Sequence, residues 1–188
     1  LYICIMDLKQ VSRKLSKILR HDPTPLYMDS HGWIMSDEII LHFGISLTDL
    51  AEIVDTNDKQ RFRFNDDRSK ICANQGHKKG LVPDKTLAQI TATQKDFILY
   101  HGTDADAAKK IKDSHIHAGN REYVNWTTNL ELATKRANQK AGWNNSTPVL
   151  ISLHVKQYLN NKGKLYLSDN NVYNTPNVPA KLLNFSDL

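Results

Sequence analysis

The residues best suited to chemistry fall in three short stretches. The first is Leu99-Tyr100-His101-Gly102-Thr103, where an apolar run beginning at Phe97 stops before a helical pattern starts. Glycine lets a backbone approach a ligand, and the free N–H groups at a helix start favour negative charge. This junction is therefore suited to a phosphate-bearing cofactor, and an ordinary structural turn is the alternative interpretation.

The other two stretches carry the remaining candidate groups. Arg20 and His21 lie in the last turn of a predicted helix, where cationic side chains also suit the negative end of the helix dipole. Ala73-Asn74-Gln75-Gly76-His77 places two carboxamides, a glycine and a histidine in one loop, which offers several donors and acceptors to a nucleotide. A solvent-exposed capping pair and a bare turn are the corresponding alternatives.

Composition limits the class of protein. The 188 residues suit one larger domain or two small ones, and 40% hydrophobic with 24% charged residues is ordinary for a globular chain. No uncharged apolar run is long enough to span a bilayer, and residues 1–6 lack a basic leader, so we expect no membrane partner. The net charge of +5 permits an anionic partner without identifying one.

Cysteine and histidine usage argues against a metal centre. Cys4 and Cys72 are far apart, and neither has a second ligand residue at metal-binding spacing. His115 and His117 share one side of an extended chain, but no third ligand type is near them, so a polar surface loop is expected. These patterns predict a reducing, cytoplasmic location and no metal.

The first half of the chain predicts three helices and a β-hairpin. Its first helix is amphipathic with a basic exposed face, and its third is predicted to begin with a capping box formed by Ser46 and Asp49. Such a unit resembles a winged helix. The predicted elements are helix 9–19, an extended piece at 32–34, helices starting at Ser36 and Ser46, and strands 61–64 and 70–73.

The polar segment 83–95 is the predicted boundary between domains 1–85 and 96–188. Beyond it, strands and helices follow one another as an α+β chain without an internal repeat. One helix is predicted to start with a capping box at Thr128 and Glu131 and to end at Gly142 and Asn144-Asn145. The other predicted elements are strand 97–100, helix 105–111, strands 123–126, 149–155 and 165–167, and closing pieces at 172–173 and 180–185.

Taken together and in order, these segments resemble the KptA family of NAD-dependent RNA 2'-phosphotransferases, also called tRNA 2'-phosphotransferases. The resemblance runs from about Val11 to Phe185. It implies an N-terminal winged-helix RNA-binding lobe and a C-terminal ADP-ribosyltransferase-like, NAD-binding lobe with a split antiparallel sheet. The matching segments are Leu15 to Pro23, Gly32-Trp33, Asn57 to Phe62, Ala73 to His77, and Leu99 to Thr103.

The resemblance implies a two-step reaction that consumes NAD and requires no metal. First, an internal RNA 2'-phosphate, of the tRNA splice-junction type, attacks the nicotinamide ribose, giving an ADP-ribosylated RNA phosphate and nicotinamide. Next, the ribose 2''-hydroxyl attacks that phosphate, releasing 2'-hydroxyl RNA and ADP-ribose 1'',2''-cyclic phosphate. Fixed cationic donors stabilise such a phosphate. The resemblance also implies that the protein is a monomer and that its substrate is RNA bearing a 2'-phosphate.

The resemblance also implies roles for the candidate residues. Arg20 would hold the 2'-phosphate through a fork of donors, and His21 would donate to the same phosphate in the second step. The Asn74 to His77 loop matches the segment that faces the dinucleotide. His101-Gly102-Thr103 matches the motif that grips the nicotinamide riboside, and Thr127 or Thr128 stands where the family usually has a serine.

The chain departs from the family pattern at three places. Cys72 stands where the family has an arginine, Gln139 stands near the place of a second arginine, and Asn125 replaces a histidine. A neutral cysteine lacks the permanent charge of arginine, and losing one charge-assisted phosphate contact costs on the order of 2 to 4 kcal/mol of transition-state stabilisation. The cations that could compensate are Lys70, Lys78, Arg136 and Lys140.

Two alternative functions follow from these departures. One is an ADP-ribosyltransferase that acts on nucleic acid or protein and stops after the first transfer. The other is a catalytically decayed homologue that still binds RNA or NAD, with RNA held by the basic first helix and the hairpin. Retention of Arg20, His21, His101 and Thr103 argues against complete decay.

Overall fold

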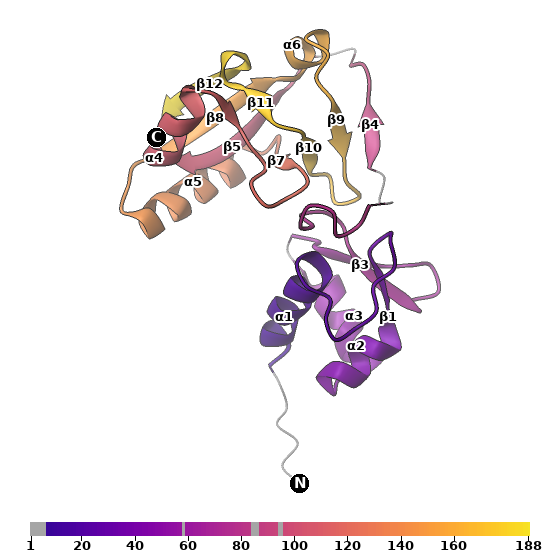
Figure 1. The fold of residues 1–188 in the computed structure, drawn as a ribbon. Helices are drawn as coiled ribbons and strands as arrows, with labels where there is room; N and C mark the ends of the chain where they lie inside the picture. Colours follow the sequence, from indigo (N-terminus) through magenta and orange to yellow (C-terminus); the bar gives the residue numbers. More distant parts are fainter. Residues whose placement is uncertain (1–6, 58, 84–86, 94–95) are drawn as a thin grey trace. The chain divides into compact units, whose positions relative to one another are not determined.

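The computed structural model describes residues 7–57, 59–83, 87–93 and 96–188 (Figure 1). The chain divides into two compact units, residues 1–86 and residues 87–188, and each is described by itself. Among the described residues, no helix is both long and apolar enough to cross a membrane.

The first unit packs three helices against a small antiparallel sheet. Its elements are α1 (Leu8–Arg20), β1 (Trp33–Met35), α2 (Ser36–Phe43), α3 (Leu47–Asp55), β2 (Phe62–Phe64) and β3 (Lys70–Ala73). The strands pair in the order β1-β3-β2. Trp33 of β1 and Arg63 of β2 lie opposite Cys72 from the two sides of the central strand.

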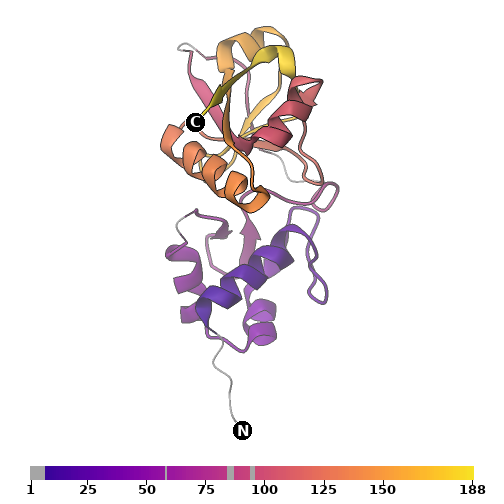
Figure 2. The ribbon, with the colours of Figure 1, turned by 90° about the vertical axis from the view of Figure 1, so that its left-hand side faces the viewer.

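Helix α1 forms as its amphipathic spacing predicts. Its apolar residues recur at helical spacing; Val11, Leu15, Ile18 and Leu19 are buried in the unit's core, and Leu8 is partly buried against it. Asp7 caps the helix by accepting a hydrogen bond from the backbone N–H of Lys9 at 3.1 Å. Figure 2 shows this helix along its whole length, in indigo. Because α1 is anchored by its buried face, the position of Arg20, its last residue, is set by the core.

Both predicted helix starts in this unit are confirmed. Ser46 Oγ accepts from Asp49 N–H at 3.1 Å, and Asp49 Oδ2 accepts from Ser46 N–H at 2.8 Å, which completes the capping box. The helix predicted to start at Ser36 starts there as α2, and Met35 occupies its N-cap without a side-chain bond. The Ser36 hydroxyl donates instead to the carbonyl of Arg68 at 2.7 Å.

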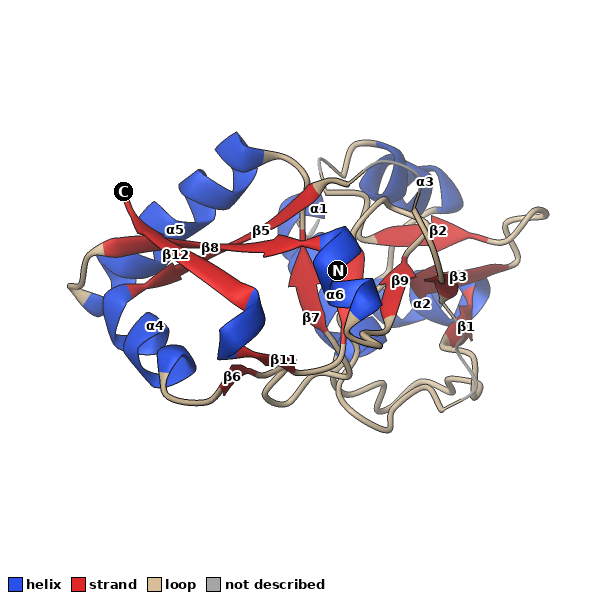
Figure 3. Cartoon of the chain, turned by 90° about the horizontal axis from the view of Figure 1, so that it is seen from above, coloured by secondary structure: helices blue, strands red, loops and turns tan. Residues whose placement is uncertain are grey.

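The second unit contains two larger antiparallel sheets and one short strand pair. Its elements are β4 (Ala88–Ile90), β5 (Ile98–Asp104), α4 (Ala105–Lys112), β6 (His115–Ile116), β7 (Val124–Trp126), α5 (Leu130–Asn144), β8 (Pro148–His154), α6 (Val155–Asn160), β9 (Leu165–Leu167), β10 (Tyr173–Thr175), β11 (Val178–Pro179), η1 (Ala180–Leu182) and β12 (Leu183–Asp187). The strand orders are β4-β9-β10-β7, β12-β8-β5 and β11-β6. Helices together with antiparallel sheets make this chain α+β, as predicted (Figure 3).

Strand boundaries in this unit differ from the sequence-based prediction. The segment 83–95 was predicted as a connection, but it contains β4, which pairs with β9. The strand predicted to stop at Tyr100 continues to Asp104, because β8 pairs with it along its whole length. His101, Gly102 and Thr103 therefore belong to a strand, so the turn predicted at these residues is wrong.

Helix boundaries also differ. Asn129 caps α5 by accepting from Leu132 N–H at 2.9 Å, so the capping box predicted at Thr128 is wrong. The end predicted at Asn144-Asn145 is confirmed, because α5 runs to Asn144 and its C-cap Asn145 is left-handed with φ of 48°, whereas Gly142 lies inside the helix. The strand predicted over 149–155 ends at His154, and α6 follows it.

Gly102 allows α5 to pack directly on β5. Figure 3 shows the helix beside this strand, and three alanines of α5 are buried in the contact. A Cβ atom added to Gly102 would lie 2.6 Å from the backbone nitrogen of Ala137 and would also collide with the carbonyl oxygen of Ala133. The glycine that the family resemblance assigned to ligand binding therefore has a packing function.

Replacement of Gly102 by alanine should lower the free energy of unfolding by about 2 to 3 kcal/mol, because the added methyl group overpacks a helix backbone that cannot move aside. Gly142→Ala is the matched control. It adds the same methyl group to α5 itself, at a position where no other atom lies within 4 Å, and should raise the free energy of unfolding by up to about 1 kcal/mol. Chemical denaturation measures both, and equal effects would contradict the packing role.

Candidate functional site

The first unit brings Arg20 together with the loop that carries residues 74–77. Lys78 N–H donates to the carbonyl oxygen of Arg20 at 2.6 Å, which ties the loop to the end of α1. Gly76 has φ of +85°, and a Cβ added there would lie 3.7 Å from Cζ and Nε of Arg20. The loop backbone therefore passes over the guanidinium group. His21 is the C-cap of α1 and is exposed to solvent.

Asn74 is almost completely buried in this loop, with 3% of its surface exposed. Its backbone N–H donates to the carbonyl of Arg61 at 2.9 Å, and Nδ2 donates to the carbonyl of Gln60 at 2.6 Å. The remaining atom, Oδ1, is buried without a hydrogen-bond partner among the described residues. An unsatisfied buried acceptor is unfavourable, so Asn74 fits a ligand that offers an N–H or O–H donor.

The other loop members differ in exposure. Gln75 and Gly76 are half-buried, whereas only 4% of His77 is exposed. A Cβ added to Gly32 would lie 3.6 Å from Nε2 of His77, so this imidazole packs against the turn before β1. Sequence reasoning assigned all four residues to ligand binding, and the structure leaves Gln75 and Gly76 as the accessible members.

The second unit brings together His101 and Thr127. Tyr100 and Thr127 exchange two backbone hydrogen bonds, of 2.8 and 3.1 Å, so β5 is bridged to the end of β7 beside His101. The His101 ring meets Trp126 edge to face, with 5.7 Å between the ring centroids. Thr127 is half-buried, and its hydroxyl oxygen accepts from Asn129 N–H at 3.1 Å. Thr128 lies on the exposed turn before α5.

The imidazole of His101 is neutral at physiological pH. Burial lowers its pKa from 6.5 to about 4; a backbone hydrogen bond to Asn125 opposes this shift, and the positive charges of Lys140, Arg136 and Arg121 add to it. His101 Nδ1 lies 3.0 Å from the carbonyl oxygen of Asn125. Because a carbonyl only accepts, Nδ1 carries the proton, and Nε2 is left as a hydrogen-bond acceptor.

Thr103 is fully buried, and its hydroxyl has an internal partner. Lys140 Nζ donates to Thr103 Oγ1 at 2.8 Å and lies 3.5 Å from Oδ2 of Asp104. Burial alone would raise the pKa of Asp104, but hydrogen bonds from Ala107 N–H and Asn144, together with the charge of Lys140, lower it. Asp104 is therefore ionised, and Lys140 balances a buried carboxylate in addition to contacting the His101 segment.

The other predicted cations have different surroundings. Lys70 Nζ lies 3.8 Å from Asp29 Oδ2 in a partly exposed ion pair, and the Lys78 side chain is exposed. Arg136 contributes positive potential at His101, and so does Arg121, which sequence reasoning missed. Arg121 follows a turn and belongs to no periodic pattern, so no sequence signal indicated it.

Cys72 is fully buried at the centre of the first unit's sheet. Its neighbours Ile71 and Ala73 belong to the hydrophobic core, so Cys72 faces the opposite side of β3. Arg63 lies directly across from Cys72 on β2, and its guanidinium carbon lies 4.7 Å from the ring centroid of Trp33 on β1. Sequence reasoning missed Arg63 as a candidate, although the alternation over 61–64 indicated a basic face.

In the described part of the chain, no group of three or more histidine, cysteine or acidic side chains could hold a metal ion. The rings of His115 and His117 lie 4.4 Å apart, beside β6. His115 Nδ1 contacts the hydroxyl of Ser114.

A family model and individual proteins similar to this chain agree in the kind of protein they name. A family model described as RNA 2'-phosphotransferase, Tpt1 / KptA family, matches residues 7–177. A protein of Fusobacterium nucleatum named "Probable RNA 2'-phosphotransferase" is 31% identical over 94% of this chain and 97% of its own length. A protein of the same name from Trichormus variabilis is 33% identical over 93% of this chain and 94% of its own length. Another from Hahella chejuensis is 34% identical over 96% of this chain and 95% of its own length.

Acid should destabilise the chain through His101. The pKa is about 4 in the folded chain and near 6.5 when unfolded, so the unfolded state takes up the proton and the free energy of unfolding falls from pH 6.5 to pH 4. For a half-buried ring this amounts to about 1 to 2 kcal/mol between pH 7 and pH 5. Denaturant unfolding at both pH values measures the loss, which His101→Asn should reduce by that amount. Equal losses in both proteins would contradict a neutral His101.

Proposed function

Because this chain belongs to the RNA 2'-phosphotransferase, Tpt1 / KptA family, we propose that it removes an internal 2'-phosphate from RNA with NAD as co-substrate. The products are 2'-hydroxyl RNA, nicotinamide and ADP-ribose 1'',2''-cyclic phosphate. The observation that carries this proposal is the family match over residues 7–177, and the two groups of side chains supply suitable chemistry.

His101 supports binding of the nicotinamide riboside. Its Nε2 accepts a hydrogen bond from a ribose hydroxyl, which a protonated imidazole could not do. The positive charges that depress its pKa, from Lys140, Arg136 and Arg121, favour a pyrophosphate nearby.

Arg20 supports binding of the 2'-phosphate. A guanidinium group offers a planar fork of donors that matches phosphate oxygens, and its charge does not depend on pH. The loop backbone at Gly76 restricts the movement of this group, so its orientation is set before the phosphate arrives. The exposed His21, next along the chain, donates to the phosphate in the second step.

The same proposal assigns RNA binding to the first unit and NAD binding to the second. The three helices and the β2-β3 hairpin of the first unit suit a winged-helix lobe. In the second unit, two antiparallel sheets linked by the Tyr100–Thr127 bridge suit a split-sheet, ADP-ribosyltransferase-like lobe.

Arg63 and Lys140 are our candidates for the role of the two arginines that the family resemblance implies at position 72 and near position 139. Arg63 lies beside Cys72 on the same face of the sheet. This face therefore carries a guanidinium group, supplied by position 63 of the neighbouring strand and not by position 72. Lys140 lies next to Gln139 and contacts Thr103 of the His101 segment. Lys70 is a weaker candidate, because Asp29 already pairs with it.

Incubation with NAD and a 2'-phosphorylated oligonucleotide should release nicotinamide and yield 2'-hydroxyl RNA. Arg20→Ala should lower turnover by about two to three orders of magnitude, because one charge-assisted phosphate contact is lost. Lys109→Ala, which removes an exposed cation of α4, is the control and should change little. Accumulated ADP-ribosylated RNA would identify a transferase that stops after the first step. No RNA-dependent nicotinamide release at high enzyme concentration would contradict the proposal.

Arg63→Gln should lower turnover by about a hundredfold, since it removes a phosphate-binding cation. The exchange variant Arg63→Cys/Cys72→Arg returns one guanidinium group to the same sheet face and should recover most of this loss. Arg68→Gln is the control, because Arg68 also lies over an aromatic ring, that of Phe64, at 5.7 Å. Full activity of Arg63→Gln, with RNA turnover followed by chromatography, would exclude Arg63.

A further inference from the structure

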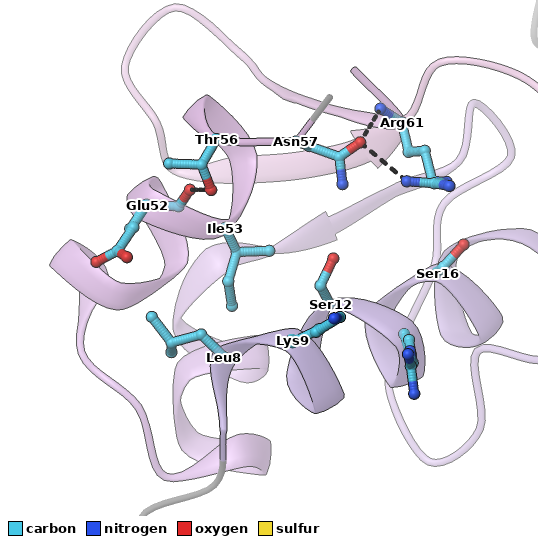
Figure 4. Close-up of a pocket in the computed structure, with 10 residues that line it drawn as sticks. Leu8, Lys9, Ser12, Ser16, Glu52, Ile53, Thr56, Asn57 and Arg61 are labelled. Carbon is cyan, nitrogen blue, oxygen red and sulfur yellow. Dashed lines mark hydrogen bonds between the residues drawn. The ribbon is translucent and has the colours of Figure 1, made fainter. Parts of the chain in front are cut away.

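A basic cavity of about 640 Å³ lies in the first unit and is lined by none of the residues proposed above to bind the 2'-phosphate or NAD (Figure 4). It opens between the N-terminal half of α1 and the end of α3. The polar side chains that line it include Lys9, Ser12, Arg13, Ser16, Asn57 and Arg61. We propose that this cavity binds the sugar-phosphate backbone of the RNA, several nucleotides from the 2'-phosphate. The inference rests on the proposed function.

The spacing along α1 connects the cavity to Arg20. Lys9, Arg13 and Ser16 recur at four and three residues, and Arg20 follows four residues later, so all four share one side of the helix. At 1.5 Å per residue, Arg13 is about 10 Å and Lys9 about 16 Å from Arg20 along the axis. A stacked strand rises about 3.4 Å per nucleotide, so these distances correspond to roughly three to five nucleotides.

The charges on α1 suit binding of a polyanion, although they do not favour the stability of the helix. Leu8–Arg20 contains no acidic residue, and Lys9 stands in the first turn, where the helix dipole disfavours a cation. Among the described residues that line the cavity, Glu52 is acidic, whereas Lys9, Arg13 and Arg61 are cations. These described residues therefore carry a net positive charge that local helix energetics does not explain.

Arg61 is oriented toward this role by its neighbour. Asn57 Oδ1 accepts from the backbone N–H of Arg61 at 3.1 Å and from its Nη1 at 3.2 Å, as Figure 4 shows. A guanidinium group held in this way loses less conformational freedom when it binds a phosphate. None of the described residues that line the cavity is aromatic, so these residues offer no surface for base stacking and suit sugar and phosphate contacts.

The test compares binding of 2'-phosphorylated RNAs of different length, followed by fluorescence anisotropy without NAD. We expect the wild-type chain to bind a substrate extended by six nucleotides on one side more tightly than a 2'-phosphorylated dinucleotide. The variant Lys9→Gln/Arg13→Gln should lose roughly twentyfold in affinity for the extended RNA at 0.1 M salt, and its salt slope should fall by about 1.4. Its affinity for the dinucleotide should stay unchanged.

The matched control is Lys14→Gln/Lys17→Gln, which removes two charges from the same helix at positions that do not line the cavity. It should keep the tighter binding of the extended RNA. An equal loss in both double variants would assign RNA binding to the overall field of α1 and overturn the proposal. So would a wild-type chain that binds extended and short RNA alike. Because binding is read without turnover, failure of the catalytic proposal is recognised separately, by the absence of nicotinamide release.

Discussion

The approach of helix α5 to strand β5 is the contact on which the second unit depends. At Gly102 the helix backbone occupies the space that any side chain would fill. This approach brings Lys140 within hydrogen-bond distance of Thr103 and close to Asp104, where its charge offsets a buried carboxylate. Burial is the main cause of the lowered pKa of His101, and the positive charges of Lys140 and Arg136, both carried by α5, add to it. The packing of α5 thus contributes to the neutral state of a candidate ligand-binding residue.

A comparable dependence links fold and chemistry in the first unit. Helix α1 is anchored by its apolar side, and each of its ends carries a residue that we propose contacts the RNA. Arg20 at its C-terminal end is covered by the loop at Gly76, and Lys9 near its N-terminal end lines the basic cavity. One rigid helix therefore sets the separation between the proposed 2'-phosphate contact and the proposed backbone contact. Rigidity matters here, since nucleic-acid recognition by shape depends on fixed spacing between charges.

The surroundings of Cys72 show how a neighbouring strand supplies charge. Cys72 is buried beside Arg63, and the guanidinium group of Arg63 reaches Trp33 on the far side of the central strand. Directly opposed residues on neighbouring strands lie about 5 Å apart, so a charge on either strand serves the same face of the sheet. The family resemblance implies an arginine at position 72, where the sequence has a cysteine, and the sheet register places the cation Arg63 beside it.

The sequence alone determined what depends on near neighbours in the chain. The amphipathic spacing of α1, the capping box of Ser46 and Asp49, and the order of the five motifs all follow from local patterns, and they were sufficient to indicate the family. Only the tertiary structure decided that β5 continues through His101 to Asp104 and that Gly102 serves packing. Those outcomes depend on α5 and β8, which begin 26 and 44 residues after β5 ends. Local sequence patterns carry no information about packing or pairing across such separations.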